Sequence, residues 1–430
     1  MTIYIHIGSH KTGSSAIQDF ILKNKINFNK NGYFIPNYSE DKNAYNFRDN
    51  YGITDGIKNT TLWQDFIKEF ECHKYKNAII STECLSFLAL EDEEYFLILK
   101  GYLKDHDTKI IYYIRRQDEY LQSFYQLLVN NPGFNCSDPI EKYMNSDEIK
   151  NYSNYYKLIS PWAKTFGKKN IIIKPYEKEQ LPDGLIKNFS EIVGINNFKN
   201  FDFTTESVNP SLEVIANELL RIFNKLFLQS VSNKKHKPVY CYQLKNKRLI
   251  NKTHLYKSKK NILKLEEELS KYNKRNKNKG LYNFFIIQKL RVGVIFNKIL
   301  KRILNKFNNR ECRPEDVKFL LDLKGKILKI LIENQGKKYF KKHYLLSKEE
   351  KIKYLLQFEE ENKKLAKEYL NRENEKLFYN EQPENCTKAV ITKQDILTCI
   401  DNIIDNNVFK KEELAILNEL KKWTKNNYAC

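Results

Sequence analysis

The stretch from Ile3 to Ser15 reads IYIHIGSHKTGSS, and it decides the fold. An apolar, β-branched run passes into a loop with two glycines, a lysine and several hydroxyls, and helical periodicity begins directly afterwards. A buried strand that leads through such a loop into a helix places backbone N–H groups around one anion. The stretch therefore predicts an α/β fold with an anion-binding loop at the end of its first strand.

The loop differs from the nucleotide-triphosphate loop of ordinary ATPases. That motif requires Gly-x-x-x-x-Gly-Lys-[Ser/Thr]. Gly8 and Gly13 have the required spacing, but Ser14 stands where the motif has its lysine, and Lys11 lies inside the loop instead. The loop still places several favourable groups around one anion, namely a cation, the hydroxyls of Ser14 and Ser15 and the helix N-terminus. The loop predicts anion binding or anion transfer and argues against an ordinary ATPase.

The length and charge of the chain limit the number of its modules and the kinds of partner it can bind. The chain has 430 residues and a formal net charge of +21, which is enough length for one large core and a second module. A basic excess of this size favours anionic partners such as phosphorylated cofactors, acidic glycans, nucleic acid or a membrane surface. Part of this positive charge reflects a composition rich in Lys, Asn, Ile and Tyr. Surface lysines often serve only to keep a protein solvated, so not all of them indicate an anionic partner. Without a zinc finger or an RNA-binding aromatic motif, we expect no nucleic-acid partner.

Cysteine usage and the N-terminus bear on localisation. The eight cysteines lie far apart, with no Cys-x-x-Cys pair and no Cys/His cluster at zinc spacing. The sequence opens on a core strand rather than a signal peptide, and no run reaches the roughly 18 apolar residues of a membrane span. These features predict a cytoplasmic protein without a metal site.

Residues 1–200 alternate strands and helices, as a parallel α/β sheet requires. We expect strands at Ile3–Ile7, Asn77–Ser81, Lys109–Ile114 and Asn170–Lys174, and a loop over residues 31–59. The pattern predicts a three-layer α/β/α architecture like that of P-loop NTPases. The expected helices of this region cover residues 14–24, 62–71, 93–104, 118–129, 157–166 and 185–193.

Beyond about residue 205 the pattern becomes helical. Ser211 is a plausible N-cap for a helix that ends near Leu228, and residues 230–280 are rich in Lys and Asn. Three parts are expected: an α/β core at 1–228, a basic helical insertion at 229–345, and a C-terminal helical segment at 346–430 that partly returns to the core. The later helices are predicted at 281–307, 314–333, 348–370 and 388–428.

Three loops follow three of the expected strand ends, at residues 11–15, 81–83 and 115–123. In a parallel sheet such loops converge at the carboxyl edge, where ligands bind. Arg115 at a strand end and Ser123 in the following helix have the spacing to close on one phosphate. The sequence therefore predicts two anion contacts at one edge of the sheet.

Residues 11–15, KTGSS, together with the spacing from Arg115 to Ser123, resemble the sulfotransferases that use 3′-phosphoadenosine 5′-phosphosulfate (PAPS). The bacterial branch is most similar, since its opening reads His-Ile-Gly-x-His-Lys-Thr-Gly-[Ser/Thr]-[Ser/Thr]. The resemblance covers about residues 1–228 and 346–378, and leaves the insertion and the tail unmatched.

The resemblance implies transfer of a sulfuryl group from PAPS to an acceptor hydroxyl, in a glycan or surface-polysaccharide precursor, without a metal. Lys11 would stabilise charge on the bridging oxygen while the group moves. Such an in-line displacement depends on positioning and electrostatics. In the same resemblance, the 5′-phosphate is held by Thr12, Gly13, Ser14 and Ser15, and the 3′-phosphate by Arg115 and Ser123.

Two residues compete for the role of the base. Glu83 ends the second expected strand, like the serine-then-glutamate strand end of the bacterial branch, and its carboxylate could accept the acceptor's proton. His10 in the loop is the alternative, although a loop histidine can also serve only local hydrogen bonding. Arg116 is expected to be an ion-pair partner, His6 a satisfied buried histidine, and Trp162 a core residue.

The amphipathic, basic stretch at 281–307 permits two interpretations. It could lie on an anionic membrane surface, which would place the protein at the inner face of the membrane. It could equally cover the sheet or the acceptor cleft, which is the commoner role of amphipathic helices and the one we favour.

Two other functional classes remain as alternatives. A P-loop kinase would require the missing Gly-Lys-[Ser/Thr] and a Mg²⁺-binding aspartate at the second or third strand end, and neither is evident. A non-catalytic protein would use its basic helical region to bind an anionic surface.

Overall fold

The computed structural model describes residues 1–36, 61–72, 75–90, 94–131, 134–204, 213–228, 314–334, 345–380, 383, 388–406 and 408–428. The chain forms two compact units. The first comprises Met1–Leu127, Asp138–Val214 and Lys342–Ala389, and the second Leu128–Ser137, Ile215–Lys341 and Val390–Cys430. The predicted segment 346–430 is therefore shared between the units, with its first part in the α/β unit.

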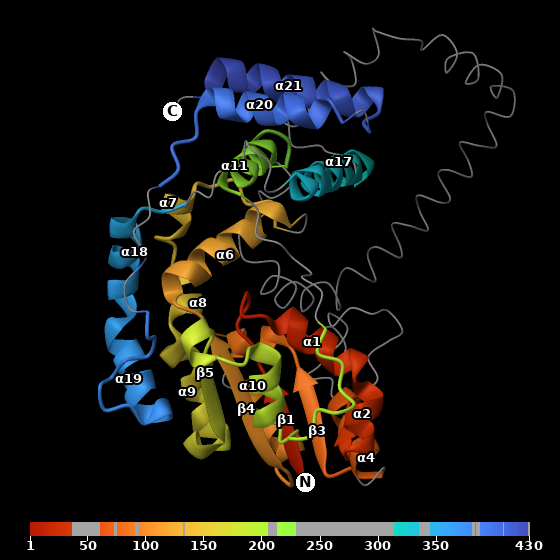
Figure 1. Ribbon diagram of the computed structural model, residues 1–430, viewed down its shortest axis with the longest axis vertical. Coiled ribbons are helices and arrows are strands. Elements are labelled where there is room, and N and C mark those ends of the chain that lie inside the picture. Colours follow the sequence, from red (N-terminus) through yellow and green to blue (C-terminus); the bar gives the residue numbers. More distant parts are fainter. Residues whose placement is uncertain are drawn as a thin grey trace, which may run out of the picture. The chain divides into compact units, whose positions relative to one another are not determined.

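The first unit contains a five-stranded sheet in the order β2-β3-β1-β4-β5, with every pairing parallel (Figure 1). The α/β class predicted from the sequence is confirmed. β1 lies at the centre, with β3 next to it on one side and β4 on the other, and ligands of such sheets gather at the carboxyl ends of the strands. The strands are β1 (Thr2–His6), β2 (Tyr33–Phe34), β3 (Asn77–Ser81), β4 (Asp107–Ile114) and β5 (Ile171–Pro175).

The prediction of a continuous loop from residue 31 was wrong at its start, because β2 occupies Tyr33–Phe34. This strand has two residues and pairs with Asn77 and Ala78 of β3 at the sheet edge. Two residues are too few to show the alternation by which strands are recognised in a sequence. The rest of that predicted loop, residues 37–59, lies outside the described residues.

Neighbouring tyrosines on β4 show that helices cover both faces of the sheet. The Tyr113 hydroxyl donates to Asn188 Oδ1 in α10 (Leu185–Ile192) at 2.9 Å. The Tyr112 ring packs edge-on against Tyr155, the first residue of α9 (Tyr155–Phe166), with 6.1 Å between ring centroids. Since successive side chains of a strand point to opposite faces, α9 and α10 lie on opposite sides of the sheet, as the three-layer prediction requires.

The two helical layers are built from aromatic and aliphatic side chains. On the α10 face, Phe20 of α1 (Ser14–Lys23), Phe28 of α2 (Lys25–Lys30) and Phe189 share a core with Ile79 and Ile111. On the other face, Trp162 of α9 is fully buried and lies 5.1 Å, between ring centroids, from Phe96 of α5. Further helices of this unit are α4 (Thr61–Cys72), α5 (Glu94–Leu103), α6 (Gln117–Asn130, whose last residues belong to the second unit), α7 (Ile140–Tyr143) and α8 (Asp147–Ser153).

The predicted helix 348–370 is interrupted. A 3₁₀ turn at Leu356–Phe358 separates α18 (Lys348–Leu355) from α19 (Glu359–Leu370), and Phe358 is buried. Ser347 caps α18 with a capping box to Glu350, which stabilises its first turn. Both helices belong to the α/β unit.

In the second unit all described elements are helical. The predicted tail helix 388–428 is two helices, α20 and α21, because the chain leaves the helix after Ile404 and restarts at Lys411. A buried lysine, Lys324, donates to Val129 O and to Asn135 Oδ1, each at 2.8 Å. Elements of this unit are α11 (Val214–Phe223), the π-helical turn Asn224–Leu228, α17 (Pro314–Glu333), α20 (Lys393–Ile404) and α21 (Lys411–Asn427).

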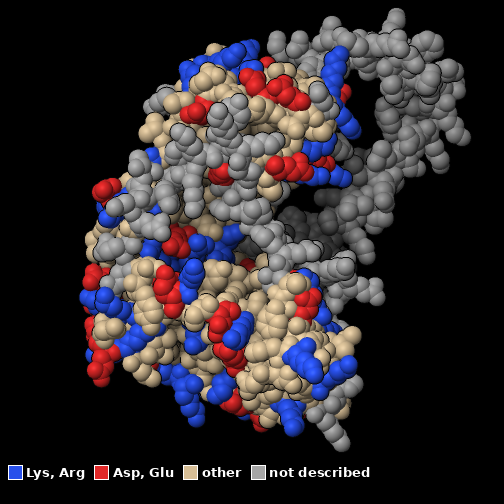
Figure 2. All heavy atoms as spheres, in the orientation of Figure 1, with Lys and Arg blue, Asp and Glu red and all other residues tan. Residues whose placement is uncertain are grey.

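Several predictions concern residues outside the described ranges, namely Ser211 as an N-cap, the Lys- and Asn-rich stretch 230–280 and the amphipathic helix 281–307. No helix in the described ranges combines the length and apolarity needed to cross a membrane. On the face of the molecule in Figure 2, Lys and Arg are interspersed with Asp and Glu rather than gathered into one basic surface.

Candidate functional site

The loop after β1 is closed by its own side chains. The Thr12 hydroxyl donates to Ser9 O at 2.6 Å and accepts from Ser9 N at 3.4 Å. Three positions of the loop have positive φ, namely Gly8 at 56°, Lys11 at 65° and Gly13 at 81°. For a lysine this backbone conformation is uncommon and strained, which marks Lys11 as a residue held in place by its surroundings.

The backbone N–H groups of the loop converge without acceptors. Within the described residues, no hydrogen bond uses the N–H groups of residues 11–15, and no side chain caps α1. The first turn of α1 also contains no acidic residue. A succession of free N–H groups at a helix N-terminus forms a concave site for an anion.

Lys11 adds a positive charge to this cradle. Its side chain is half-buried, and its Nζ forms no hydrogen bond or ion pair with any residue that the structure describes. Burial lowers the pKa of Lys11; the carboxylate of Glu83 opposes this shift, and the charge of Arg115 adds to it. A partly desolvated ammonium group without a partner is suited to bind an anion that enters the loop.

Arg115 lies across the sheet edge from Lys11, as the sequence predicts. Its Nη1 is 3.5 Å from Lys11 O, and its Nε donates to Glu119 Oε2 at 2.9 Å. The hydroxyl of Tyr155 donates to Arg115 O at 2.6 Å and fixes the backbone there. Ser123 is half-buried on α6, one turn beyond Glu119, and therefore shares its helix face. The two predicted anion contacts thus lie at one edge.

The two candidate bases are in direct contact. His10 Nδ1 lies 2.6 Å from Glu83 Oε2, and Glu83 opens the 3₁₀ helix η1 (Glu83–Leu90) that follows β3. Burial raises the pKa of Glu83, but the charge and hydrogen bond of His10, together with the charge of Lys11, outweigh this effect, so that the pKa lies below its ordinary value. The carboxylate is therefore ionised at neutral pH and within electrostatic reach of Lys11.

His6 is buried in β1, as expected, but it is only partly satisfied, because no described residue forms a hydrogen bond with its Nε2. Its Nδ1 forms a 2.8 Å hydrogen bond with Ser81 Oγ, and its ring packs edge-on against Tyr113. Burial lowers the pKa of His6 to about 4, although Glu83 acts in the opposite direction. His6 is consequently neutral in the folded protein at pH 7 and contributes to the core.

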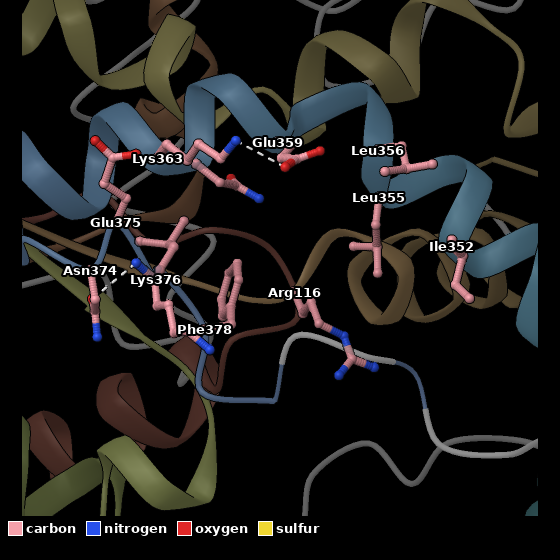
Figure 3. Close-up of a pocket in the computed structure, with 12 residues that line it drawn as sticks. Arg116, Ile352, Leu355, Leu356, Glu359, Lys363, Asn374, Glu375, Lys376 and Phe378 are labelled. Atoms are coloured by element: carbon pink, nitrogen blue, oxygen red, sulfur yellow. Dashed lines mark hydrogen bonds and ion pairs between the residues drawn. The ribbon is translucent and has the colours of Figure 1, made fainter.

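Arg116 is an ion-pair partner rather than part of the anion cradle. Its Nε donates to Asp118 Oδ1 at 2.7 Å, and its Nη1 donates to Asn380 O at 2.7 Å. Arg116 borders a cavity of about 330 Å³ beside α18 and α19 that contains none of the predicted site residues (Figure 3). Lys363 and Glu359, which line the same cavity, pair with each other at 2.9 Å. The cavity is thus separate from the loop after β1.

The sequence analysis missed an open groove of about 550 Å³ that begins at Gly13. The signal that could have located it is Tyr176, which directly follows β5 and so stands at a fourth strand end of the same edge. A Cβ atom at Gly13 would lie 3.5 Å from the Tyr176 hydroxyl oxygen. The groove is lined by aromatic, aliphatic, glycine and two charged residues, namely Gly13, Ala16, Tyr176, Asp183, Gly184, Leu185, Ile186, Lys187, Phe198 and Phe203.

A segment from the far end of the α/β unit braces the turn that carries Tyr176. The carboxylate of Glu177 accepts from Tyr379 N at 2.5 Å, and Gln180 Nε2 donates to Leu377 O at 2.9 Å. The ring of Tyr379 is also stacked by the Arg372 guanidinium, 4.8 Å from the ring centroid. We call residues 371–380 the strap.

Comparisons with known proteins found limited similarity. No family model matches the chain. A protein of Archaeoglobus fulgidus, described only as uncharacterized, is 34% identical over 148 residues, which is 34% of this chain and 38% of that protein. The chain thus spans well under half the length of this curated relative. Among solved structures, a sulfotransferase from Alicyclobacillus acidocaldarius gives a TM-score of 0.33 at 13% identity, covering 55% of this chain and 97% of the other.

Proposed function

We propose that the chain transfers a sulfuryl group from PAPS to an acceptor hydroxyl. The observation that carries the proposal is the pairing of two anion contacts at one sheet edge, the loop of residues 11–15 and Arg115, with Nη1 of Arg115 3.5 Å from Lys11 O. A donor with a 5′-phosphosulfate and a 3′-phosphate presents two anionic groups on one nucleoside. The motif resemblance found in the sequence points to the same donor.

The groove beside Gly13 supports a nucleoside next to the anion loop. Tyr176, Phe198 and Phe203 line it, and aromatic rings bind the flat face of a base. The groove starts at the residue that ends the anion loop, so a base there and a 5′-phosphate in the loop are compatible with one ligand. These residues fit PAPS, whose role is to supply an activated sulfuryl group.

The residues divide the chemistry among them. The N–H groups of the loop and the Lys11 ammonium stabilise the negative charge that develops on the bridging oxygen. Arg115, just after the end of β4, holds the 3′-phosphate together with Ser123 on the following helix α6, by charge-assisted hydrogen bonds. Thr12 acts through its N–H alone, because its hydroxyl is already engaged with Ser9 O.

Glu83 is the base in this proposal. Its side chain is 24% exposed, against 3% for His10, so Glu83 is the group that an acceptor can reach. The acceptor oxygen forms a bond to sulfur, the bond between sulfur and the phosphate oxygen breaks with its electron pair staying on the phosphate, and the acceptor's proton goes to the Glu83 carboxylate. The assignment of a glycan hydroxyl as acceptor rests on the motif resemblance alone.

Calorimetric titration with adenosine 3′,5′-bisphosphate and with ATP–Mg²⁺ tests the proposal on the wild type, Lys11→Ala and Arg115→Ala. Lys142→Ala is the matched control, since Lys142 is an exposed lysine paired with Asp138. We expect tight bisphosphate binding that both site variants weaken and the control does not. A preference for ATP–Mg²⁺ would favour a kinase, and binding of neither nucleotide would favour a non-catalytic role.

A further inference from the structure

The contact between His10 and Glu83 joins two groups with very different surroundings. The His10 side chain is enclosed by the rings of Phe87 and Phe124, at centroid distances of 5.1 and 5.7 Å. Glu83 lies on the outer side of the pair and keeps its contact with solvent. The imidazole is therefore the fixed member of the pair, and the carboxylate is the member that meets a substrate.

The two oxygens of Glu83 are not equivalent. Oε2 is bound to His10 Nδ1, while Oε1 forms no hydrogen bond with any residue that the structure describes. Because an ionised carboxylate only accepts, His10 Nδ1 must carry the hydrogen of this bond. Oε2 is thus bound within the protein, and Oε1 remains available to accept a proton from a substrate.

Gly8 also limits where the Glu83 carboxylate can move. A Cβ atom at position 8 would lie 3.3 Å from both Cα and Cγ of Glu83. The Glu83 side chain therefore rests directly on the backbone of the anion loop. Packing on Gly8 and the hydrogen bond to His10 together restrict where Oε1 can point.

We propose that His10 is a positioning residue of this site: its Nδ1–H holds Oε2 of Glu83 so that Oε1 faces the acceptor hydroxyl and takes its proton. The inference rests on the proposed function for the reaction, but the coupling of His10 to the Glu83 carboxylate can be measured without it. His10 then acts through Glu83 and does not touch the substrate.

Two variants separate the hydrogen bond from the packing. His10→Asn keeps an N–H donor near the position of Nδ1, whereas His10→Leu keeps an apolar side chain in the Phe87–Phe124 enclosure and loses the donor. Thermal unfolding shows whether both variants are folded. In the protein without substrate, ¹³C NMR of labelled glutamate follows the Glu83 carboxyl, assigned through Glu83→Gln. We expect its pKa to rise in His10→Leu and to rise less in His10→Asn.

The second measurement compares two acceptors with PAPS as donor. Water must lose a proton during the transfer, whereas 4-nitrophenolate has already lost it. We expect His10→Leu to lower PAPS hydrolysis about 10²-fold, the size of a general-base contribution. Transfer to 4-nitrophenolate should fall much less, and His10→Asn should recover part of the hydrolysis.

Equal losses with both acceptors, or an unchanged Glu83 pKa in a folded His10→Leu protein, would overturn the proposal. Failure of the wild type to bind adenosine 3′,5′-bisphosphate would instead refute the proposed function. In that case the NMR titration still decides whether His10 controls the carboxylate.

Discussion

Arg115 Nη1 lies 3.5 Å from the carbonyl oxygen of Lys11, although the two residues are 104 positions apart in the chain. The parallel pairing of β1 with β4 produces this approach, because both strands end at the same edge of the sheet. A cation from each of two loops therefore faces one small region, and the proposed nucleotide bridges them.

Replacement of Arg115 should remove recognition of the 3′-phosphate selectively. Loss of charge-assisted hydrogen bonds costs about 2 kcal/mol, or about 30-fold in affinity. Arg115→Ala should therefore weaken the binding of adenosine 3′,5′-bisphosphate by about that factor. It should weaken the binding of adenosine 5′-monophosphate far less, and calorimetry measures both affinities. Ser123→Ala should act in the same direction with a smaller effect. Equal weakening of the two nucleotides would show that Arg115 does not bind the 3′-phosphate.

The neighbouring Arg116 should behave in the opposite way. Its guanidinium pairs with the fully buried Asp118, and removal of one partner from a buried pair costs about 3 kcal/mol or more. Arg116→Ala should lower the free energy of unfolding in urea by about this amount, with little change in bisphosphate affinity below the transition. A loss of binding comparable to that of Arg115→Ala would place Arg116 in the site.

The groove beside Gly13 predicts that Tyr176 contributes to binding the base. Stacking of a base on an aromatic ring is worth about 1–3 kcal/mol. Tyr176→Ala should weaken the binding of adenosine 3′,5′-bisphosphate about 10-fold without affecting the binding of inorganic pyrophosphate. Tyr176→Phe should bind both ligands about as well as the wild type. Competition binding measures both ligands. A parallel loss for pyrophosphate would mean that the substitution disturbs the anion loop itself.

Two glycine-to-alanine substitutions test at which position the backbone requires glycine. At Gly13 the φ of 81° disfavours alanine, and the new methyl group would overlap the Leu185 side chain. Gly13→Ala should lower the free energy of unfolding by about 2 kcal/mol or more. Gly101 in α5 has open space around it and no positive φ, so Gly101→Ala should be neutral or stabilising by up to about 1 kcal/mol. Similar urea midpoints for the two variants would contradict this.

His6 predicts a pH dependence of stability. Its pKa is about 4 in the folded protein and about 6.5 in an unfolded chain. Between these values the unfolded state binds more protons, so the contribution is fully present above pH 6.5 and is lost as the pH falls towards 4. It amounts to about 3 kcal/mol. Urea unfolding from pH 7.5 to 4 should show a shallower decline for His6→Asn than for the wild type, and parallel curves would refute the assignment.

Strong local patterns account for what the sequence predicted of the fold. β1, β3, β4 and β5 each contain an apolar run that leads into a polar loop, the pattern of buried parallel strands. β2 escaped notice because pairing with β3, not its own two residues, makes it a strand. The break at Leu356–Phe358 was likewise invisible, since a 3₁₀ turn inside a helical period leaves the apolar spacing almost unchanged.

The site shows a similar division. Lys11 and Arg115 could be selected because each follows a strand end, and parallel strands bring such ends together. The relation between His10 and Glu83 could not be selected, because a sequence presents them as rivals for one role and only their 2.6 Å contact shows them as partners. The groove was missed because Phe198 and Phe203 belong to no recognisable motif, and only tertiary packing brings them beside Gly13.

The strap also has a consequence for synthesis of the protein. Glu177 reaches its backbone partner only at Tyr379, 202 residues later, and a ribosome adds about 5–20 residues each second. The sheet strands can all pair well before this contact exists, so the turn that carries Tyr176 stays unbraced for about 10 s or more of translation. The nucleotide-binding edge is then among the last parts of the α/β unit to mature, and a nascent chain acquires its sheet before its proposed ligand site.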